Sequence, residues 1–158
     1  MRRWLGSTVL RVCCQLALGL VFIISASGKF KSPKGFLSAV AGYQLLPDPL
    51  VVLVASSLPG VELLTGLLLI LGLVAWGRIV RLYARAAALV AALMLAAFII
   101  VLSFNLSRGI EMDCGCFDLL GVYIPYFAPS KADWWTVLRD VWMLGLAVPV
   151  LMRGKRDR

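Results

Sequence analysis

The residues of this chain best suited to chemistry are Cys114 and Cys116, which are separated only by Gly115. Two thiols this close can form a disulfide and so accept or donate a pair of electrons. A bridge between residues i and i+2 needs an unusual backbone bend, which glycine tolerates at no Cβ cost. Such a bridge is easier to reduce than a relaxed one, and it removes little loop entropy. The spacing therefore predicts a redox-active dithiol rather than a structural cross-link.

A second pair of thiols, Cys13 and Cys14, is adjacent in sequence within an apolar segment. Neighbouring residues on a helix point about 100° apart and rarely form a disulfide. Both cysteines are interpreted first as small apolar residues that pack against other helices. The alternative is a second thiol station that passes electrons or a soft metal inward, across roughly 20 Å of helix.

The elements that must position these thiols are apolar segments long enough to cross a bilayer. The chain is 61% hydrophobic and 15% charged, with a mean hydropathy of +0.93. A spanning helix needs about 20 apolar residues. The sequence predicts an all-α integral membrane protein, a bundle of four spanning helices in a single domain over residues 1–158. The first apolar run resembles a signal peptide, but we expect it to be a retained helix. The expected spans are residues 12–28, 50–75, 86–106 and 136–152.

Basic residues predict the orientation of these spans, because lysine and arginine are enriched on the cytoplasmic side. The richer side contains Arg2, Arg3, Arg11, Arg78, Arg81, Arg85, Arg153, Lys155, Arg156 and Arg158, and the other side contains Lys29, Lys31, Lys34, Arg108, Lys131 and Arg139. Both termini are therefore expected in the cytoplasm. Cys114 and Cys116 then face the periplasm or exterior, where disulfides persist.

The first outer connection is expected to contain a short helix that lies at the membrane interface. Phe36, Val40, Tyr43 and Leu46 follow the i, i+4, i+7 spacing of an amphipathic helix.

Composition excludes several other functions. The chain has no histidine, which excludes His-based acid–base catalysis and His-containing zinc or haem sites. No metal site is predicted. The net charge of +8 comes from basic residues at the ends of apolar runs, which favours lipid headgroups over nucleic acid as partners.

A carboxylate inside the second span, Glu62, is costly and by default either functional or paired. The candidate partners are Lys29, Arg108 and Arg139, each expected near the outer end of a different helix. A structural ion pair and a role in contacting protons or a quinone both stay open. Three glycines in the spans are expected to allow close helix packing: Gly19, Gly66 and Gly72.

Several motifs together resemble a known family. They are Ser27-Gly28-Lys29-Phe30, Tyr43-Gln44-Leu45-Leu46-Pro47, Leu58-Pro59 to Glu62, Asn105-Leu106-Ser107-Arg108-Gly109, Cys114-Gly115-Cys116-Phe117 and Arg139-Asp140. In this order the chain resembles the MauE family of methylamine-utilization membrane proteins, relatives of the DoxX-like redox-associated membrane proteins. Asp118 departs from the pattern, where the family usually has glycine, and Cys13-Cys14 is not part of it.

The resemblance implies a four-helix protein of the bacterial inner membrane that forms or isomerises disulfides of exported proteins together with a periplasmic thioredoxin-like partner. Cys114 and Cys116 would be the redox pair of a thiol–disulfide oxidoreductase. The supporting polar residues would be Glu62, Lys29, Arg108 and Arg139. Analogy with other four-helix disulfide-generating enzymes adds a membrane quinone as a candidate electron acceptor.

Two alternatives from other classes stay open. The thiols of Cys13, Cys14, Cys114 and Cys116 would also suit a soft-metal carrier of the mercuric-ion type. The third hypothesis is a non-catalytic scaffold subunit of a membrane redox complex.

Overall fold

The structure, a computed structural model, describes residues 8–74, 78–109 and 133–151. In these ranges the chain forms helices α1 (Thr8–Lys31), α2 (Pro33–Gly42), α3 (Asp48–Val74), α4 (Arg78–Ser107) and α6 (Trp134–Leu151). Four of them are long and apolar enough to cross a membrane: α1, α3, α4 and α6. The four expected spans are confirmed as helices.

The helix ends differ from the expected limits in one consistent way. In α1 and α4 the helix continues past the apolar run to include polar residues such as Lys29, Lys31 and Ser107. Hydropathy marks only the apolar part of a helix, whereas backbone hydrogen bonds continue until the chain turns. The consequence is functional, because Lys29 lies on the last turns of a helix and not in a loop.

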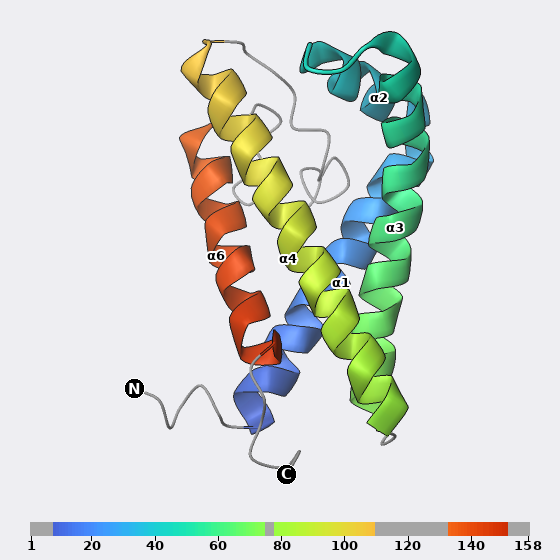
Figure 1. The fold of residues 1–158 in the computed structure, drawn as a ribbon, viewed down its shortest axis with the longest axis vertical. Helices are drawn as coiled ribbons and strands as arrows, with labels where there is room; N and C mark the ends of the chain where they lie inside the picture. Colours follow the sequence, from blue (N-terminus) through green and yellow to red (C-terminus); the bar gives the residue numbers. More distant parts are fainter. Residues whose placement is uncertain (1–7, 75–77, 110–132, 152–158) are drawn as a thin grey trace.

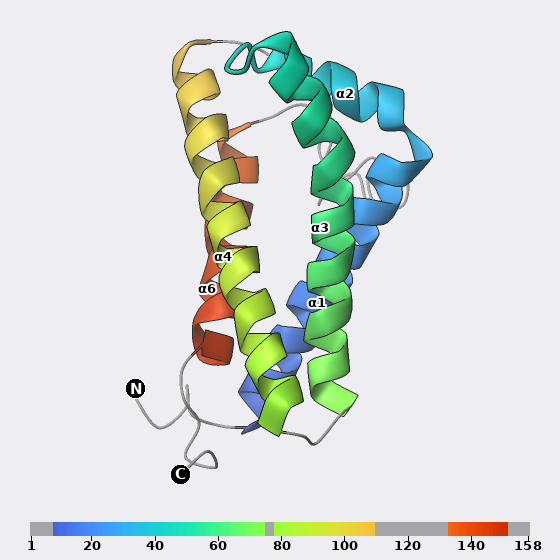
Figure 2. The ribbon, with the colours of Figure 1, turned by 45° about the vertical axis from the view of Figure 1, so that its right-hand side comes forward.

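The four long helices run alternately up and down (Figure 1). Each packs against two neighbours: α1 against α3 and α6, and α4 against α3 and α6. The beginning of α1 and the end of α6 therefore lie at one end of the bundle. The opposite end contains the end of α1, helix α2, the end of α4 and the beginning of α6 (Figure 2). These are called the Arg11 end and the α2 end below.

Glycines bring α1 and α3 into backbone contact. A Cβ on Gly66 would lie 2.9 Å from the carbonyl oxygen of Gly19 and 2.8 Å from Cγ1 of Ile23. A Cβ on Gly72 would lie 2.4 Å from Cβ of Ala84 on α4. Small residues drive close packing of membrane helices, where no hydrophobic force between helices operates. The packing role expected of Gly19, Gly66 and Gly72 is confirmed.

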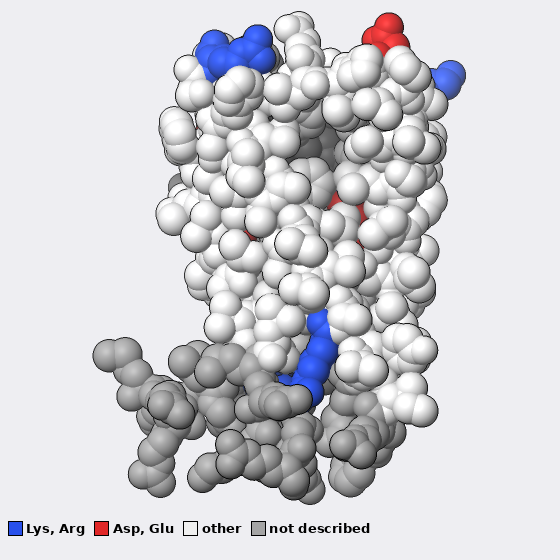
Figure 3. Space-filling view, in the orientation of Figure 1, with Lys and Arg blue, Asp and Glu red and all other residues white. Residues whose placement is uncertain are grey.

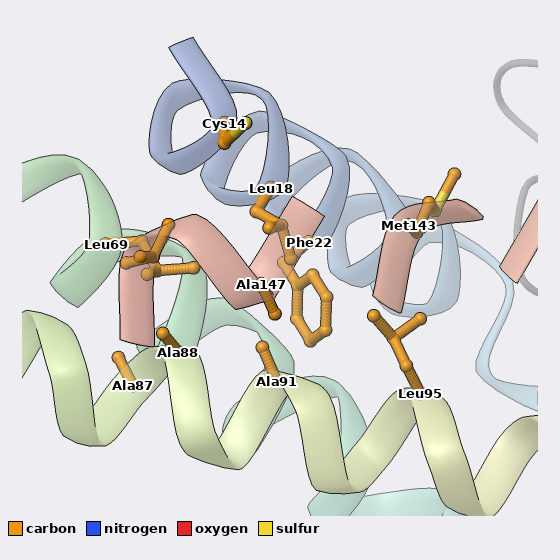
Figure 4. Close-up of a cluster of buried hydrophobic side chains, with 11 residues drawn as sticks. Cys14, Leu18, Phe22, Leu69, Ala87, Ala88, Ala91, Leu95, Met143 and Ala147 are labelled. Carbon is orange, nitrogen blue, oxygen red and sulfur yellow. The ribbon is translucent and has the colours of Figure 1, made fainter. Parts of the chain in front are cut away.

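The Arg11 end is closed by an apolar core drawn from all four long helices (Figure 4). Leu18 and Phe22 of α1 meet Leu69 of α3 and Ala91 of α4 in this cluster. Arg11 closes the end itself, since its guanidinium donates to the carbonyls of Pro149 and Val150 at 3.0 and 3.4 Å. Those carbonyls lie in the last turn of α6, where backbone acceptors lack helical partners.

Helix α2 forms where the first connection was expected to contain a helix. Pro33 occupies its first turn, where a missing N–H costs nothing. Phe36 and Val40 are buried and pack with Val51 of α3, so the apolar face of α2 is used in contacts within the protein. Leu46 of the expected pattern is 40% exposed and lies beyond the helix. That α2 lies at a membrane interface stays a prediction.

The surface agrees with a bundle surrounded by lipid. Large apolar side chains are exposed along the long helices, among them Leu64, Leu93 and Ile100. In Figure 3 charged atoms gather at the two ends of the bundle and are almost absent from the middle of the face. The exceptions are a few acidic atoms that show between white ones near the middle of the face, below a hollow in its upper half.

Candidate functional site

The interior of the bundle is divided into a polar and an apolar part. The buried polar side chains of the described residues are Ser25, Lys29, Glu62, Thr65, Asn105, Thr136, Arg139 and Asp140. They lie from the middle of the bundle to the α2 end. The buried side chains towards the Arg11 end are apolar, apart from the thiol of Cys14. A cluster of ionisable groups is therefore confined to one half of the membrane-spanning region.

Lys29 of α1 and Glu62 of α3 form a buried ion pair at the centre of this cluster. Lys29 Nζ donates to Glu62 Oε1, and the two side chains are 0% and 4% exposed. Ser25 lies one turn before Lys29 on the same face of α1, and its hydroxyl is 3.3 Å from Glu62 Oε2. The spacing of four residues places both donors towards α3. Of the three candidate partners of Glu62, the structure pairs it with Lys29.

Two aromatic rings enclose the Lys29 ammonium on its other sides. Its Nζ lies 4.8 Å from the ring centroid of Phe36 on α2 and 5.4 Å from that of Phe98 on α4. Both distances are within the range of cation–π attraction. Lys29 therefore links four elements at the α2 end, since α1 carries it, α3 supplies the carboxylate, and α2 and α4 supply the rings.

A second ion pair is provided by two consecutive residues of α6. Arg139 Nη2 and Nε lie 3.0 and 3.2 Å from Asp140 Oδ1, and both side chains are more than nine-tenths buried. These residues are paired with each other, in addition to any contact across the bundle. Two carboxylates and two cations thus share the interior of one membrane bundle.

A cavity of about 30 Å³ separates the two ion pairs. Its polar lining is Ser25, Glu62, Arg139 and Asp140, and its apolar lining is Val21, Phe22, Leu95, Phe98 and Met143. A water molecule needs about 10–15 Å³ of this kind of volume and two to four polar partners. The cavity therefore has the size and the lining for water.

Asn105 is a buried polar residue that was named from the sequence only as part of the Asn105–Gly109 motif, with no role in the site. It is 2% exposed, and neither its Oδ1 nor its Nδ2 has a hydrogen-bond partner in the described structure. It lies on α4 in register with Leu102 and Phe98, on the face that looks into the bundle. Asn105 follows the interior positions Leu102 and Phe98 by three and seven residues. This spacing could have identified Asn105 as an interior residue from the sequence. Asp140 and Phe98 were also not assigned to the site from the sequence.

The remaining predicted residues lie elsewhere. Arg108 is exposed just beyond the end of α4, with its guanidinium 5.5 Å from the ring centroid of Phe104. Cys13 is exposed, and Cys14 is 5% exposed within the apolar core; both are free thiols. Cys114 and Cys116 lie outside the described residues. No group of three or more His, Cys, Asp or Glu able to hold a metal occurs within residues 8–74, 78–109 and 133–151.

Comparison with known proteins matches nearly the whole chain to one family. The family model of the methylamine utilisation protein MauE matches residues 6–153. The chain belongs to the MauE family. The matched region includes both buried ion pairs, Asn105, Cys114 and Cys116.

A methylamine utilization protein MauE of Paracoccus denitrificans is 32% identical over 137 residues. The alignment covers 86% of this chain and 65% of that relative. The chain thus spans less than two thirds of the length of its MauE relative. No solved structure matches this chain.

Proposed function

We propose that this MauE-family protein is a membrane thiol–disulfide redox protein that acts through Cys114 and Cys116. The observation that carries the proposal is the cluster of buried ionisable groups in the half of the bundle towards the α2 end. The cysteine-bearing segment joins Ser107 of α4 to Trp134 of α6, and both of these residues lie at that end (Figure 1). Buried charges inside a membrane bundle are costly and mark functional sites.

The proposed reaction is an exchange between two pairs of thiols. A thiolate of a thioredoxin-like periplasmic protein attacks one sulfur of the Cys114–Cys116 disulfide and forms a mixed disulfide. The partner's second thiol then attacks that bond and releases the dithiol. The partner is oxidised, this protein is reduced, and the two protons of the partner's thiols pass to Cys114 and Cys116. The reverse direction transfers a disulfide to the partner and onward to an exported protein.

Charge supports an orientation in which the α2 end faces outward, into the periplasm of a bacterial inner membrane. Arg11 and Arg85 belong to the opposite half of the bundle, as do the positions of Arg78 and Arg81 in the first turns of α4. At the α2 end Lys29 is neutralised by Glu62 within the protein. The positive-inside rule therefore favours cytoplasmic termini.

The cavity between the ion pairs is too small for a quinone ring, and a quinone site at the outer ends of the helices stays a prediction. A cavity of about 150 Å³ is of the size that accommodates benzene. The cavity here is about 30 Å³ and is suited to water. The proposed exchange is therefore written between thiols and disulfides alone.

The test is to trap the mixed disulfide in cells. Cys116→Ser leaves Cys114 able to attack but removes the thiol that would resolve the bond, so a partner should accumulate as a disulfide-linked adduct on non-reducing gels. Cys114→Ser removes the attacking thiol, so this variant should lose activity and form no adduct at position 114. The matched control, Cys13→Ser with Cys14→Ser, should behave as wild type.

The alternatives predict different results. A soft-metal carrier requires Cys13 and Cys14 for metal uptake by whole cells, so that control would then lose function. A scaffold subunit would keep full function without all four cysteines. Wild-type activity of a Cys114→Ser, Cys116→Ser double variant would overturn the proposal.

A further inference from the structure

We infer that Glu62 is a proton-exchange site that communicates through water in the cavity it shares with Arg139 and Asp140. This inference concerns the described interior of the bundle. The use of the proton in thiol chemistry rests on the proposed function. Four features of the cluster support this role: its hydrogen bonding, its charge balance, its cavity and its closure towards the Arg11 end.

Glu62 has acceptor capacity that its protein donors do not use. An ionised carboxylate offers about four lone-pair directions. The described residues supply two donors, Lys29 to Oε1 and Ser25 to Oε2. Glu62 also lines the cavity, which has room for water. Water there would accept from donors such as Arg139 and donate to both Glu62 and Asp140.

Among the described residues the charges around Glu62 balance, so either protonation state has a cation at hand. Facing it are Lys29 from α1, and Arg139 and Asp140 from α6. The elements α2 and α4 contribute the rings of Phe36 and Phe98, which do not titrate. Protonation of Glu62 leaves Lys29 held by those two rings. The ammonium therefore keeps attractive contacts when its counter-ion is neutralised.

A purely structural pair would need neither the cavity nor a second carboxylate. Replacing a buried ion pair by well-packed apolar residues is often neutral or stabilising. In this bundle the charged groups are instead retained around a small cavity, where Ser25, Glu62, Arg139 and Asp140 interrupt an otherwise apolar lining. This arrangement is expected of a group that exchanges protons with water.

The interior is closed between the site and the Arg11 end. Towards the Arg11 end the interior is filled by Leu18, Phe22 and Leu69, with Ala91 and Leu95 on α4 (Figure 4). Backbone contact between Gly19 and Gly66 closes the seam between α1 and α3. We therefore expect water and protons to reach Glu62 from elsewhere than the Arg11 end.

In the proposed exchange such a site has a defined use. The attacking thiol must lose a proton, and the departing thiolate must gain one. Glu62 would accept the first proton through water and return it, so that its own charge is unchanged after one exchange.

The test measures the carboxyl group directly. Infrared difference spectra of the purified protein in lipid nanodiscs, between neutral and acidic pH, should show a protonated carboxyl band that Glu62→Gln removes. The band should shift in heavy water, because the site exchanges with solvent. Asp48→Asn, an exposed carboxyl at the start of α3, is the matched control and should leave this band in place.

Glu62→Gln leaves Lys29 buried without its carboxylate, so a second variant, Glu62→Gln with Lys29→Met, removes both charges and keeps the shape. A folded double variant that retains the band would overturn the inference. A Glu62 band that does not shift in heavy water, or no Glu62 band in protein that stays folded, would also overturn it.

The infrared test is independent of the proposed function, because it can be made in a variant in which Cys114 and Cys116 are serine. A band that persists there while the cysteines prove dispensable in cells would refute the redox proposal and leave the proton site standing. If the band is present but Glu62→Gln does not change the pH profile of Cys114 alkylation, the link to thiol chemistry is refuted.

Discussion

Lys29 and Glu62 form an ion pair whose side chains are 0% and 4% exposed, inside a bundle with four helices long enough to cross a membrane. It is the contact that joins the last turns of α1 to the middle of α3. Because Phe36 and Phe98 also surround the ammonium, the pair connects every element at the α2 end except α6. Its energetic role can be separated from its chemical role by substitution.

We expect Lys29→Met to lower the free energy of unfolding by about 3–5 kcal/mol, because it leaves Glu62 as an uncompensated buried charge. The double substitution Lys29→Met, Glu62→Leu should recover most of this loss. Thermal unfolding in detergent, followed by circular dichroism, measures both. Equal destabilisation of the single and double variants would show that the two residues do not act as a pair.

The contact between α1 and α3 should be sensitive to a single methyl group. Gly66→Ala places a Cβ 2.9 Å from the carbonyl oxygen of Gly19, and overpacking of this kind costs about 1–3 kcal/mol. Gly60→Ala, on the same helix, is the control because its Cβ would meet nothing within 4 Å. There the gain in helix propensity should stabilise the protein slightly, by up to about 1 kcal/mol. A smaller loss at Gly66 than at Gly60 would contradict the packing described.

Asn105→Leu should stabilise the protein. Its side-chain amide is buried and has no partner in the described structure, and an unsatisfied buried polar group costs about 1–3 kcal/mol. Leucine has the same number and branching of non-hydrogen side-chain atoms and no polar atoms, although its methyl groups are larger than the amide. The comparison is Thr136→Val, which loses the hydrogen bond from the Asp133 N–H to Thr136 Oγ1 and should destabilise. Lower stability of Asn105→Leu would mean that the amide binds water or another group.

The two cysteines of α1 should differ in reactivity although they are adjacent. Cys13 is exposed and Cys14 is 5% exposed in the apolar core. In variants that keep only one of them, a small maleimide should label Cys13 in detergent many times faster than Cys14. Denaturation should make the two rates similar. Equal rates in the folded protein would contradict the rotation of α1 described here.

The sequence alone predicts the four spans, because about 20 apolar residues specify a membrane helix without reference to the rest of the fold. It also determined that Cys114 and Cys116 are close, since one residue separates them, and that Glu62 is exceptional, since a carboxylate in an apolar run must be explained. The packing role of Gly19, Gly66 and Gly72 was equally readable.

Which residues meet could be known only from the packing of the helices. Lys29, Arg108 and Arg139 were equivalent partners for Glu62 by sequence, because each was expected near the same membrane surface. The choice depends on the rotation and approach of the helices, which close contact between Gly19 and Gly66 fixes for α1 and α3. That packing turns Lys29 towards Glu62, whereas Arg108 lies beyond the last turn of α4 against Phe104. The cavity that Glu62 shares with Arg139 and Asp140 also depends on helix packing. It lies between four helices, so the sequence of any one helix does not predict it.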